Sequence, residues 1–342
     1  MSVHISIVVC CYNSSKRITD TLKHILNQDA DGIFEIIVVN NNSVDDTRGV
    51  AEKVLGSSVR AIPFKVVDEP RPGLSYARER GFSESKGEVI LMVDDDNHLD
   101  TGYIRLVDEL MESDSSIGIL GGLSSAVYEQ KVPDWFRDMD NVLAVGQPWG
   151  VEDGAFVEAS AVYGAGMSIR RQVLVSIKQA GFESQLTDRK GKNLSSGGDT
   201  EICMAARMAG HRVVFCNRLR FRHIISADRL DWPYMRRLYE GFGRAKAYID
   251  IYEHFLAGRP MPPANSRLPY WADRLIHLAK ELFGKDKRLS LFSALTDSGE
   301  RAVRLATWAH LALMKEILFN RARYMQSWIV IGSFQQRLKD LR

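Results

Sequence analysis

Three consecutive carboxylates, Asp94, Asp95 and Asp96, directly follow an apolar run in the segment "EVILMVDDDNHL". Neighbouring negative charges repel one another, and a turn that only caps the next helix needs one acid rather than three. A divalent cation removes the repulsion, because Mg²⁺ and Mn²⁺ prefer carboxylate oxygens and keep ligand positions for phosphate. The cluster therefore predicts a metal site, with a plain strand-to-helix turn as the simpler interpretation.

A further acid, Asp199, stands at the start of a helical pattern in "GGDTEICMAARMAG". An acid at this position is a candidate for the chemistry of a site, and Glu201 follows two residues later. Asp is also a favoured helix N-cap, and a capping role explains Asp199 without catalysis.

The elements that must position these acids alternate between strand-like and helix-like patterns. Continuous β-branched runs predict buried strands, and apolar residues at helical spacing predict helices between them. The strands are expected at 4–10, 34–40, 62–68 and 88–94, and the helices at 13–28, 43–56 and 72–85. Ser14 or Ser15 is expected to cap the first helix. This alternation predicts an α/β domain with a largely parallel sheet.

Polar clusters follow three of the predicted strands. Tyr12 and Asn13 come after the first strand, residues 40–43 ("NNNS") after the second, and the three acids after the fourth. Ligands of parallel α/β sheets bind outside the carboxyl ends of the strands. These clusters are therefore expected to meet in space.

The character of the chain changes near residue 227. The sequence predicts a catalytic α/β domain over residues 1–226 and a helical region over residues 227–342. Residues 301–334 combine Trp, Leu and Ile with Arg and Lys. Two interpretations of this stretch are open: helices that pack on the catalytic domain, or a segment that lies on a membrane surface.

The composition is that of an ordinary soluble protein, with 45% hydrophobic and 26% charged residues among 342. A net charge of +2 gives no argument for a nucleic-acid partner. No stretch approaches about 18 uncharged apolar residues, so no spanning helix is predicted. The four cysteines form no C-x-x-C pair, which favours reduced core residues in a cytoplasmic protein. The N-terminus "MSVHISIVVC" shows no signal-peptide pattern.

Three chemistries suit a metal and carboxylates on an α/β sheet. A phosphatase-type site needs a Thr in a D-x-D-x-T run. Here His98 stands two residues after Asp96, where that Thr would be. Nucleotidyl transfer usually needs a Gly-rich phosphate loop, whereas "CCYNSSKR" after the first strand contains no glycine. The third chemistry is glycosyl transfer from a nucleotide sugar, in which a metal bridges the diphosphate leaving group.

An ordered set of segments resembles the family 2 glycosyltransferases. The segments are "SIVVCCYNSSKRITDTLKHILNQ", "EIIVVNNNSVDDT", "EPRPGLSYARERGFSESKGEVILMVDDDNHL" and "GGDTEICMAARMAGHRVVF" followed by "RFRH". They cover about residues 4–226. The resemblance implies a GT-A fold, in which a mixed, mostly parallel sheet is flanked by helices, and transfer with inversion of anomeric configuration.

The resemblance implies nucleotide-binding roles at five positions. Tyr12 would stack on the base, with Asn13 beside it, and Asn41 would meet the base edge. Asp95 would lie near the ribose. Arg78 in "SYARERG" would face the nucleotide, although a surface ion pair with a nearby glutamate explains it equally well.

The resemblance also implies the metal and catalytic positions. Asp96 would be the direct ligand of a divalent cation, Mn²⁺ or Mg²⁺, and His223 would reach the diphosphate or the metal. Asp199 would be the general base, because an acceptor hydroxyl is a poor nucleophile until a base takes its proton, and Glu201 is the next candidate. Asp94 is an extra acid that would support the site.

One departure from the family pattern affects the choice of donor. Family members usually carry two aspartates where this chain has Asn40 and Asn41. The amide oxygen of Asn41 can accept a hydrogen bond from a uracil N–H without charge assistance. A UDP-sugar is therefore the favoured donor, and guanine or thymine nucleotides are less excluded than usual.

The sequence thus predicts a metal-dependent inverting glycosyltransferase. It would move a sugar from a nucleotide-diphosphate donor to a hydroxyl of a glycan or lipid-linked acceptor, in the synthesis of a cell-surface polysaccharide or glycolipid at the cytoplasmic face of a membrane. Two alternatives stay open. One is a metal-dependent phosphotransferase or phosphohydrolase with Asp94 as nucleophile, and the other is a non-catalytic nucleotide-sugar-binding protein.

Overall fold

The computed structural model divides the chain into two compact units. Unit 1 comprises Met1–Ile177 and Ile202–Ala227, and unit 2 comprises Lys178–Glu201 and Asp228–Arg342. The structure describes residues 4–30, 32–137, 139–148, 150–151, 154–186, 188, 194, 196–262, 269–283 and 301–341. The sequence predicts a single boundary near residue 227, whereas the structure also groups Lys178–Glu201 with the C-terminal helices.

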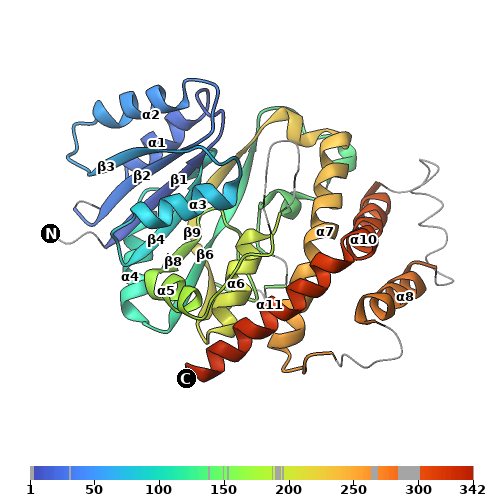
Figure 1. Ribbon diagram of the computed structural model, residues 1–342. Coiled ribbons are helices and arrows are strands. Elements are labelled where there is room, and N and C mark those ends of the chain that lie inside the picture. The colour runs from blue at the N-terminus through green and yellow to red at the C-terminus, as the bar shows by residue number, and fades with distance from the viewer. Residues whose placement is uncertain are drawn as a thin grey trace. The chain divides into compact units, whose positions relative to one another are not determined.

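Unit 1 is built on one mixed sheet, seen in Figure 1. Its strands are β1 (Ile5–Cys11), β2 (Phe34–Asn41), β3 (Phe64–Glu69), β4 (Val89–Asp94), β5 (Asn97–Leu99), β6 (Ile117–Tyr128), β7 (Phe156–Glu158), β8 (Ser168–Arg170) and β9 (Arg212–Ile225). Their order is β3-β2-β1-β4-β8-β6-β9-β5, and β7 pairs with β9. The first four strands in this order run parallel, while β8 pairs antiparallel with both of its neighbours. The predicted mixed, mostly parallel sheet is confirmed.

Helices cover both faces of this sheet. They are α1 (Ile18–Leu26), α2 (Thr47–Gly56), α3 (Leu74–Glu84), α4 (Tyr103–Ser113), α5 (Arg171–Gln179) and α6 (Gly198–Met208), with short 3₁₀ turns η1 (Asp134–Phe136), η2 (Asp140–Leu143) and η3 (Ala227–Leu230). Successive side chains of a strand point to opposite faces. Ile7 of β1 accordingly packs in the core that includes Leu22 of α1 and Val107 of α4. Val8 packs on the other face with Ala77 of α3.

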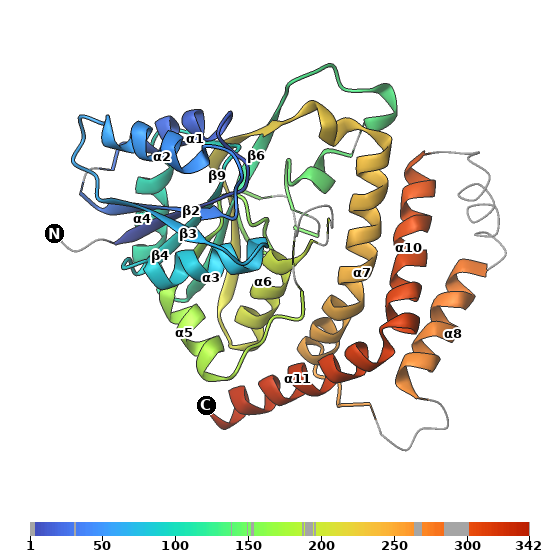
Figure 2. The ribbon, with the colours of Figure 1, turned by 45° about the horizontal axis from the view of Figure 1, so that its top comes forward.

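Unit 2 is helical. Its helices are α7 (Trp232–Leu256), α8 (Tyr270–Phe283), α10 (Arg301–Phe319) and α11 (Arg321–Asp340). Helices α7 and α10 lie side by side in Figure 2. Gly243 permits their close approach, because a Cβ there would stand 2.0 Å from the backbone oxygen of Ala309. No helix among the described residues is both long and apolar enough to cross a membrane.

The segment Lys178–Glu201 belongs to unit 2 because α11 holds it. The Nε of Arg337 donates to the backbone oxygen of Ala180 at 2.6 Å, and the Oγ of Ser327 donates to Oε1 of Gln185 at 2.7 Å. The rings of Phe182 and Phe334 meet edge to face, with centroids 5.7 Å apart. No sequence pattern indicated these contacts, since they join residues about 150 positions apart.

Candidate functional site

The three polar clusters predicted to converge do lie at one edge of the sheet. Strand β1 is hydrogen-bonded between β2 and β4, with Cys11 opposite Asn40 and Cys10 opposite Asp94. All three strands are parallel, so their carboxyl ends meet at the same edge. The structure thus brings the turn after β1, the asparagines after β2 and the acids after β4 together on unit 1.

The turn after β1 presents Tyr12 and anchors Asn13. Tyr12 is 49% exposed at the strand end. Asn13 has a φ of 50°. Its backbone N–H donates to Oγ of Ser43 at 3.0 Å, and its Oδ1 accepts from the backbone N–H of Val44 at 2.9 Å. Asn13 therefore ties this turn to the one that follows β2.

The side-chain amide of Asn41 is hydrogen-bonded to the main chain at the end of β3 and in the segment that follows it. Its Nδ2 donates to the backbone oxygens of Glu69 at 3.0 Å and Arg71 at 2.7 Å, and its Oδ1 accepts from the backbone N–H of Gly73 at 2.9 Å. The side chain is 6% exposed. An ionised Asp cannot donate these two bonds. This gives a structural reason for Asn at a position where the family usually has Asp, while contact with a base edge stays a prediction.

Asp95 is buried under the start of α1. Its Oδ2 accepts from the hydroxyl of Ser14 and from Nη2 of Arg17, the latter at 2.9 Å, and the hydroxyl of Thr21 donates to its backbone oxygen at 2.9 Å. Burial, and then the charge of Asp96, raise the pKa of Asp95. The predicted position near a ribose stays a prediction, and what the contacts show is that Asp95 joins β4 to α1.

The same contacts correct the predicted cap of α1. The helix begins at Ile18, its N-cap residue is Arg17, and no side chain caps it. The hydroxyl of Ser14 is directed to Asp95 instead. Ser14 and Arg17 are functional candidates that sequence reasoning missed. No local pattern reveals them, because their partner lies about 80 residues further along the chain.

Asp96 and His223 form a buried pair. Their side chains are each 5% exposed, and Nε2 of His223 lies 3.3 Å from Oδ1 of Asp96. Strand pairing produces the contact, since Asn97 of β5 stands opposite His223 of β9 and the backbone N–H of Ile224 donates to the oxygen of Asp96 at 2.9 Å. The Nδ2 of Asn97 also donates to Oδ1 of Asp96 at 3.2 Å.

This pair fits a divalent cation. A carboxylate and an imidazole are oxygen and nitrogen donors that Mn²⁺ accepts, and Mg²⁺ or Mn²⁺ sites often rely on one or two protein ligands completed by water and substrate phosphate. Asp94 is half-buried at the end of β4, beside the pair in sequence. The predicted ligands Asp96 and His223 therefore come together in the structure.

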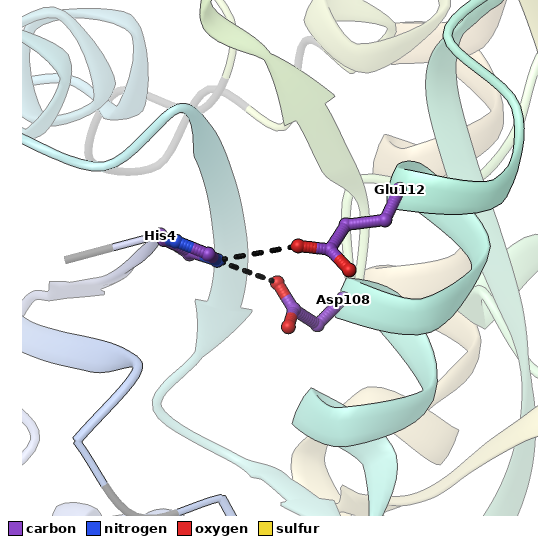
Figure 3. A group of neighbouring side chains, drawn as sticks. All are labelled: His4, Asp108 and Glu112. Atoms are coloured by element: carbon purple, nitrogen blue, oxygen red, sulfur yellow. Dashed lines mark ion pairs between the residues drawn. The ribbon is translucent and has the colours of Figure 1, made fainter. Parts of the chain in front are cut away.

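A different group holds three candidate ligand atoms within 4.8 Å of one another, the one such group among the described residues. It consists of His4, Asp108 and Glu112 (Figure 3). Nδ1 of His4 lies 3.5 Å from Oδ1 of Asp108 and 3.6 Å from Oε1 of Glu112. His4 precedes β1, so this group lies at the amino ends of the strands, away from the polar clusters. It is a half-exposed ion-pair group.

Asp199 and Glu201 both lie in the first turn of α6, in unit 2. The helix begins at Gly198, so Asp199 stands inside the first turn, and its Oδ1 accepts from the backbone N–H of Thr200 at 2.8 Å. Asp199 is half-buried. The role of Asp199 as the general base stays a prediction.

Glu201 has a different environment from Asp199. It is 1% exposed. Its Oε2 accepts from the hydroxyl of Ser184 at 2.5 Å and the backbone N–H of Leu186 at 3.4 Å, and its Oε1 accepts from the backbone N–H of Gln185 at 2.7 Å and the hydroxyl of Tyr252 at 3.0 Å. Burial raises its pKa to about 7. Four donors engage both carboxylate oxygens. The structure therefore favours Glu201 as an anchor, which holds residues 184–186 and Tyr252 to the start of α6, and not as the general base.

Arg78 is the remaining predicted nucleotide-binding residue. It lies one turn into α3, and only 8% of it is exposed. α3 begins directly after Gly73, which Asn41 binds at the strand-end edge. Contact between Arg78 and the nucleotide stays a prediction.

Comparisons with known proteins find glycosyltransferases. Residues 6–148 match the family described as Glycosyl transferase family 2. The chain is 24% identical over 289 residues to a glucosyl-dolichyl phosphate glucuronosyltransferase of Haloferax volcanii, covering 81% of this chain and 87% of that protein. It is 33% identical over 140 residues to the putative glycosyltransferase EpsH of Bacillus subtilis, covering 41% of this chain and 38% of that one.

Solved structures show the same fold. The mannosyltransferase PcManGT of Pyrobaculum calidifontis, in complex with GDP-Man and Mn²⁺, superposes with a TM-score of 0.54 at 20% identity, over 100% of this chain and 89% of that one. TarS 1–349 of S. aureus, in complex with UDP-GlcNAc, superposes with a TM-score of 0.50 at 18% identity, over 98% and 92%.

The match to glycosyl transferase family 2 over residues 6–148, the glycosyltransferase relatives and the shared fold identify the chain as a glycosyltransferase with the GT-A fold. The phosphotransferase and non-catalytic alternatives are thereby set aside.

Proposed function

We propose that the protein is a metal-dependent, inverting glycosyltransferase that moves a sugar from a nucleoside-diphosphate donor, a UDP-sugar in the first place, to a hydroxyl of a glycan or lipid-linked acceptor. The observation that carries the proposal is the meeting of the polar ends of β1, β2 and β4 at one edge, with Asp96 and His223 3.3 Å apart beside them.

The chain's own residues supply the donor site. The exposed ring of Tyr12 offers a stacking face for the base, and Asn13 holds the turn that carries it. Asn41 fixes the segment from Glu69 to Gly73, which borders the same edge. Asp96 and His223 would hold the divalent cation, which when bound neutralises charge on the diphosphate leaving group.

Asp199 would act on the acceptor. Its carboxylate takes the proton of the acceptor hydroxyl as the oxygen attacks the anomeric carbon. The new carbon–oxygen bond forms on the face opposite the bond that breaks to the nucleoside diphosphate, so a single displacement inverts the anomeric configuration. The nucleoside diphosphate departs with the electron pair of the broken bond.

The printed names of two relatives support the choice of acceptor. The Haloferax volcanii relative is a glucosyl-dolichyl phosphate glucuronosyltransferase, and a Campylobacter jejuni relative, 29% identical over 100 residues, is a GalNAc(5)-diNAcBac-PP-undecaprenol β-1,3-glucosyltransferase. These names describe enzymes of lipid-linked sugars. They support a lipid-linked acceptor, in polysaccharide or glycolipid synthesis. An enzyme that acts on such an acceptor works at a membrane surface, and we propose peripheral contact with the cytoplasmic face.

A panel of nucleotide sugars tests the proposal. Ligand that binds only the folded protein raises its melting temperature by mass action. With Mn²⁺ present, UDP-sugars are expected to raise the melting temperature more than GDP- or dTDP-sugars. The best donor is then incubated with a lipid-linked acceptor, and NMR of the product is expected to show the anomeric configuration opposite to that of the donor. No shift with any nucleotide sugar, or a product of retained configuration, would contradict the proposal.

A further inference from the structure

The C-terminal region is basic, although the whole chain is nearly neutral. Residues 228–342 contain 20 Lys and Arg against 12 Asp and Glu, whereas residues 1–227 contain 25 against 31. The net charges are therefore +8 and −6. A basic region is attracted to anionic lipid surfaces.

A cavity lies between α7 and α10 in this region, within unit 2. Arg236 and Arg244 of α7 line it together with Trp308, Lys315 and Phe319 of α10. Its volume is about 220 Å³. Pockets that enclose a whole drug-sized ligand usually measure roughly 300–1,000 Å³. The cavity therefore suits a single headgroup better than a nucleotide sugar.

The two acids that line the cavity are engaged by protein groups. Oε1 of Glu316 accepts from the hydroxyl of Tyr248 at 2.7 Å and lies 4.0 Å from Nη1 of Arg323. Oε1 of Glu240 accepts from Nε of Arg236 at 3.2 Å. Three basic and two acidic side chains line the cavity, so its lining has a formal excess of one positive charge, which favours an anion.

The guanidinium of Arg236 is held by an aromatic ring. The guanidinium of Arg236 lies over the ring of Trp308, 3.8 Å from its centroid. A stacked guanidinium presents its N–H groups at its edge, where phosphate oxygens bind in pairs. Lys315 is exposed and makes no ion pair with any residue in the described part of the chain.

Apolar side chains at the end of α10 border this basic group. Phe319 lines the cavity and is 74% exposed, and its neighbour Leu318 is 40% exposed. Exposed aromatic and aliphatic side chains beside Lys and Arg are the combination that binds at the boundary between lipid headgroups and acyl chains.

We propose that the α7–α10 cavity binds the phosphate of an anionic phospholipid in a bilayer, with Phe319 inserted into the lipid interface. The proposal rests on the membrane contact of the proposed function and gives that contact a ligand and a set of residues. Arg236 and Lys315 would bind phosphate oxygens, and the acyl chains would remain in the bilayer.

Vesicle flotation of the full chain tests this site. The protein is expected to float with vesicles of phosphatidylcholine containing 30% phosphatidylglycerol, and not with phosphatidylcholine alone. The double variant Arg236→Gln with Lys315→Gln is expected to weaken binding at least tenfold. A matched double variant, Arg237→Gln with Lys339→Gln, removes two exposed charges of the same unit outside the cavity and is expected to weaken binding less than threefold.

Three results would overturn the proposal. Equal binding to both kinds of vesicle would exclude anion recognition. Equal losses in the two double variants would show general charge attraction without a site. Binding only when the vesicles carry a polyprenyl phosphate would assign the cavity to an acceptor lipid in place of a phospholipid.

A separate measurement distinguishes failure of this site from failure of the proposed function. The cavity variants are expected to keep the melting-temperature rise produced by a nucleotide sugar with Mn²⁺, because that rise reports donor binding alone. Loss of flotation with a retained rise supports the site, and loss of both would show that the variants disturb the whole fold. In that case, Phe319→Ser, which leaves every cavity charge in place, is expected to reduce flotation severalfold, and unchanged flotation would overturn the proposal.

Discussion

Buried carboxylates in the two units have different partners. In unit 1, Asp95 faces Arg17 and Asp96 faces His223 at the strand ends. In unit 2, Glu201 faces hydroxyl and backbone amide donors, among them Tyr252. A carboxylate whose oxygens are filled by neutral donors is held in place. One that meets a histidine at a ligand-binding edge can exchange that contact for a metal.

The contrast separates two acids that stand two residues apart. Asp199 is half-buried and Glu201 is fully buried. Sequence reasoning ranked both as candidate bases, because both are acids in the first turn of one helix. Their surroundings indicate different roles, and variants at each position test the difference between them.

The largest effect is expected for Asp199→Asn. Loss of the general base should lower turnover by about 10²–10⁴-fold, with donor affinity unchanged. Loss of a negative charge in the first helical turn should cost no more than about 1 kcal/mol of stability. Steady-state kinetics and thermal unfolding of the purified variant check both values. Unchanged turnover would show that Asp199 serves only the helix start.

The next largest effect is expected for Glu201→Gln, and it depends on pH. The folded-state pKa of Glu201 is raised from 4.5 to about 7, so its contribution to stability is fully present below pH 4.5 and is lost as the pH rises through 7. The wild type should therefore lose up to about 3 kcal/mol relative to the variant between pH 4.5 and pH 8. Denaturant unfolding at both pH values measures this difference. An equal difference in stability between wild type and variant at the two pH values would contradict the anchor role of Glu201.

A smaller effect is expected in unit 1 for Asn41→Ala. The variant leaves the backbone groups of Glu69, Arg71 and Gly73 without their side-chain partner, at a cost of about 2 kcal/mol. Asn41→Asp should cost a similar amount, since it restores the residue usual in the family but removes both donors. Thermal unfolding checks both variants. A fully stable Asn41→Asp protein would show that the amide is not needed to hold this segment.

The smallest effect is expected for Tyr12→Ala. Stacking of a base on an aromatic ring is worth about 1–3 kcal/mol, so donor affinity should fall about tenfold. Tyr12→Phe keeps the ring and should bind the donor as the wild type does. Calorimetric titration with the donor and Mn²⁺ compares the two. Equal affinities for the Ala and Phe variants would remove Tyr12 from the site.

The sequence predicted the sheet and the meeting of the polar clusters because both follow from local patterns. Buried parallel strands are continuous apolar runs, and polar residues after them mark one edge. The contacts of Asp95 with Ser14, and of Glu201 with Tyr252, join residues 81 and 51 positions apart. Such pairs depend on tertiary packing, which a single sequence does not display. For the same reason the grouping of Lys178–Glu201 with the C-terminal helices was not foreseen.

The central claim is that Asp96 and His223 form the metal-binding part of the donor site. The most direct test measures the rate of sugar transfer by Asp96→Asn, by the wild type and by the exposed control Asp100→Asn. Each rate is measured with Mn²⁺ present and again after chelation. The account predicts that Asp96→Asn and chelated wild type both lose at least about a hundredfold in rate, while Asp100→Asn keeps the wild-type rate. Full activity of Asp96→Asn, or a wild-type rate that chelation leaves unchanged, would contradict it.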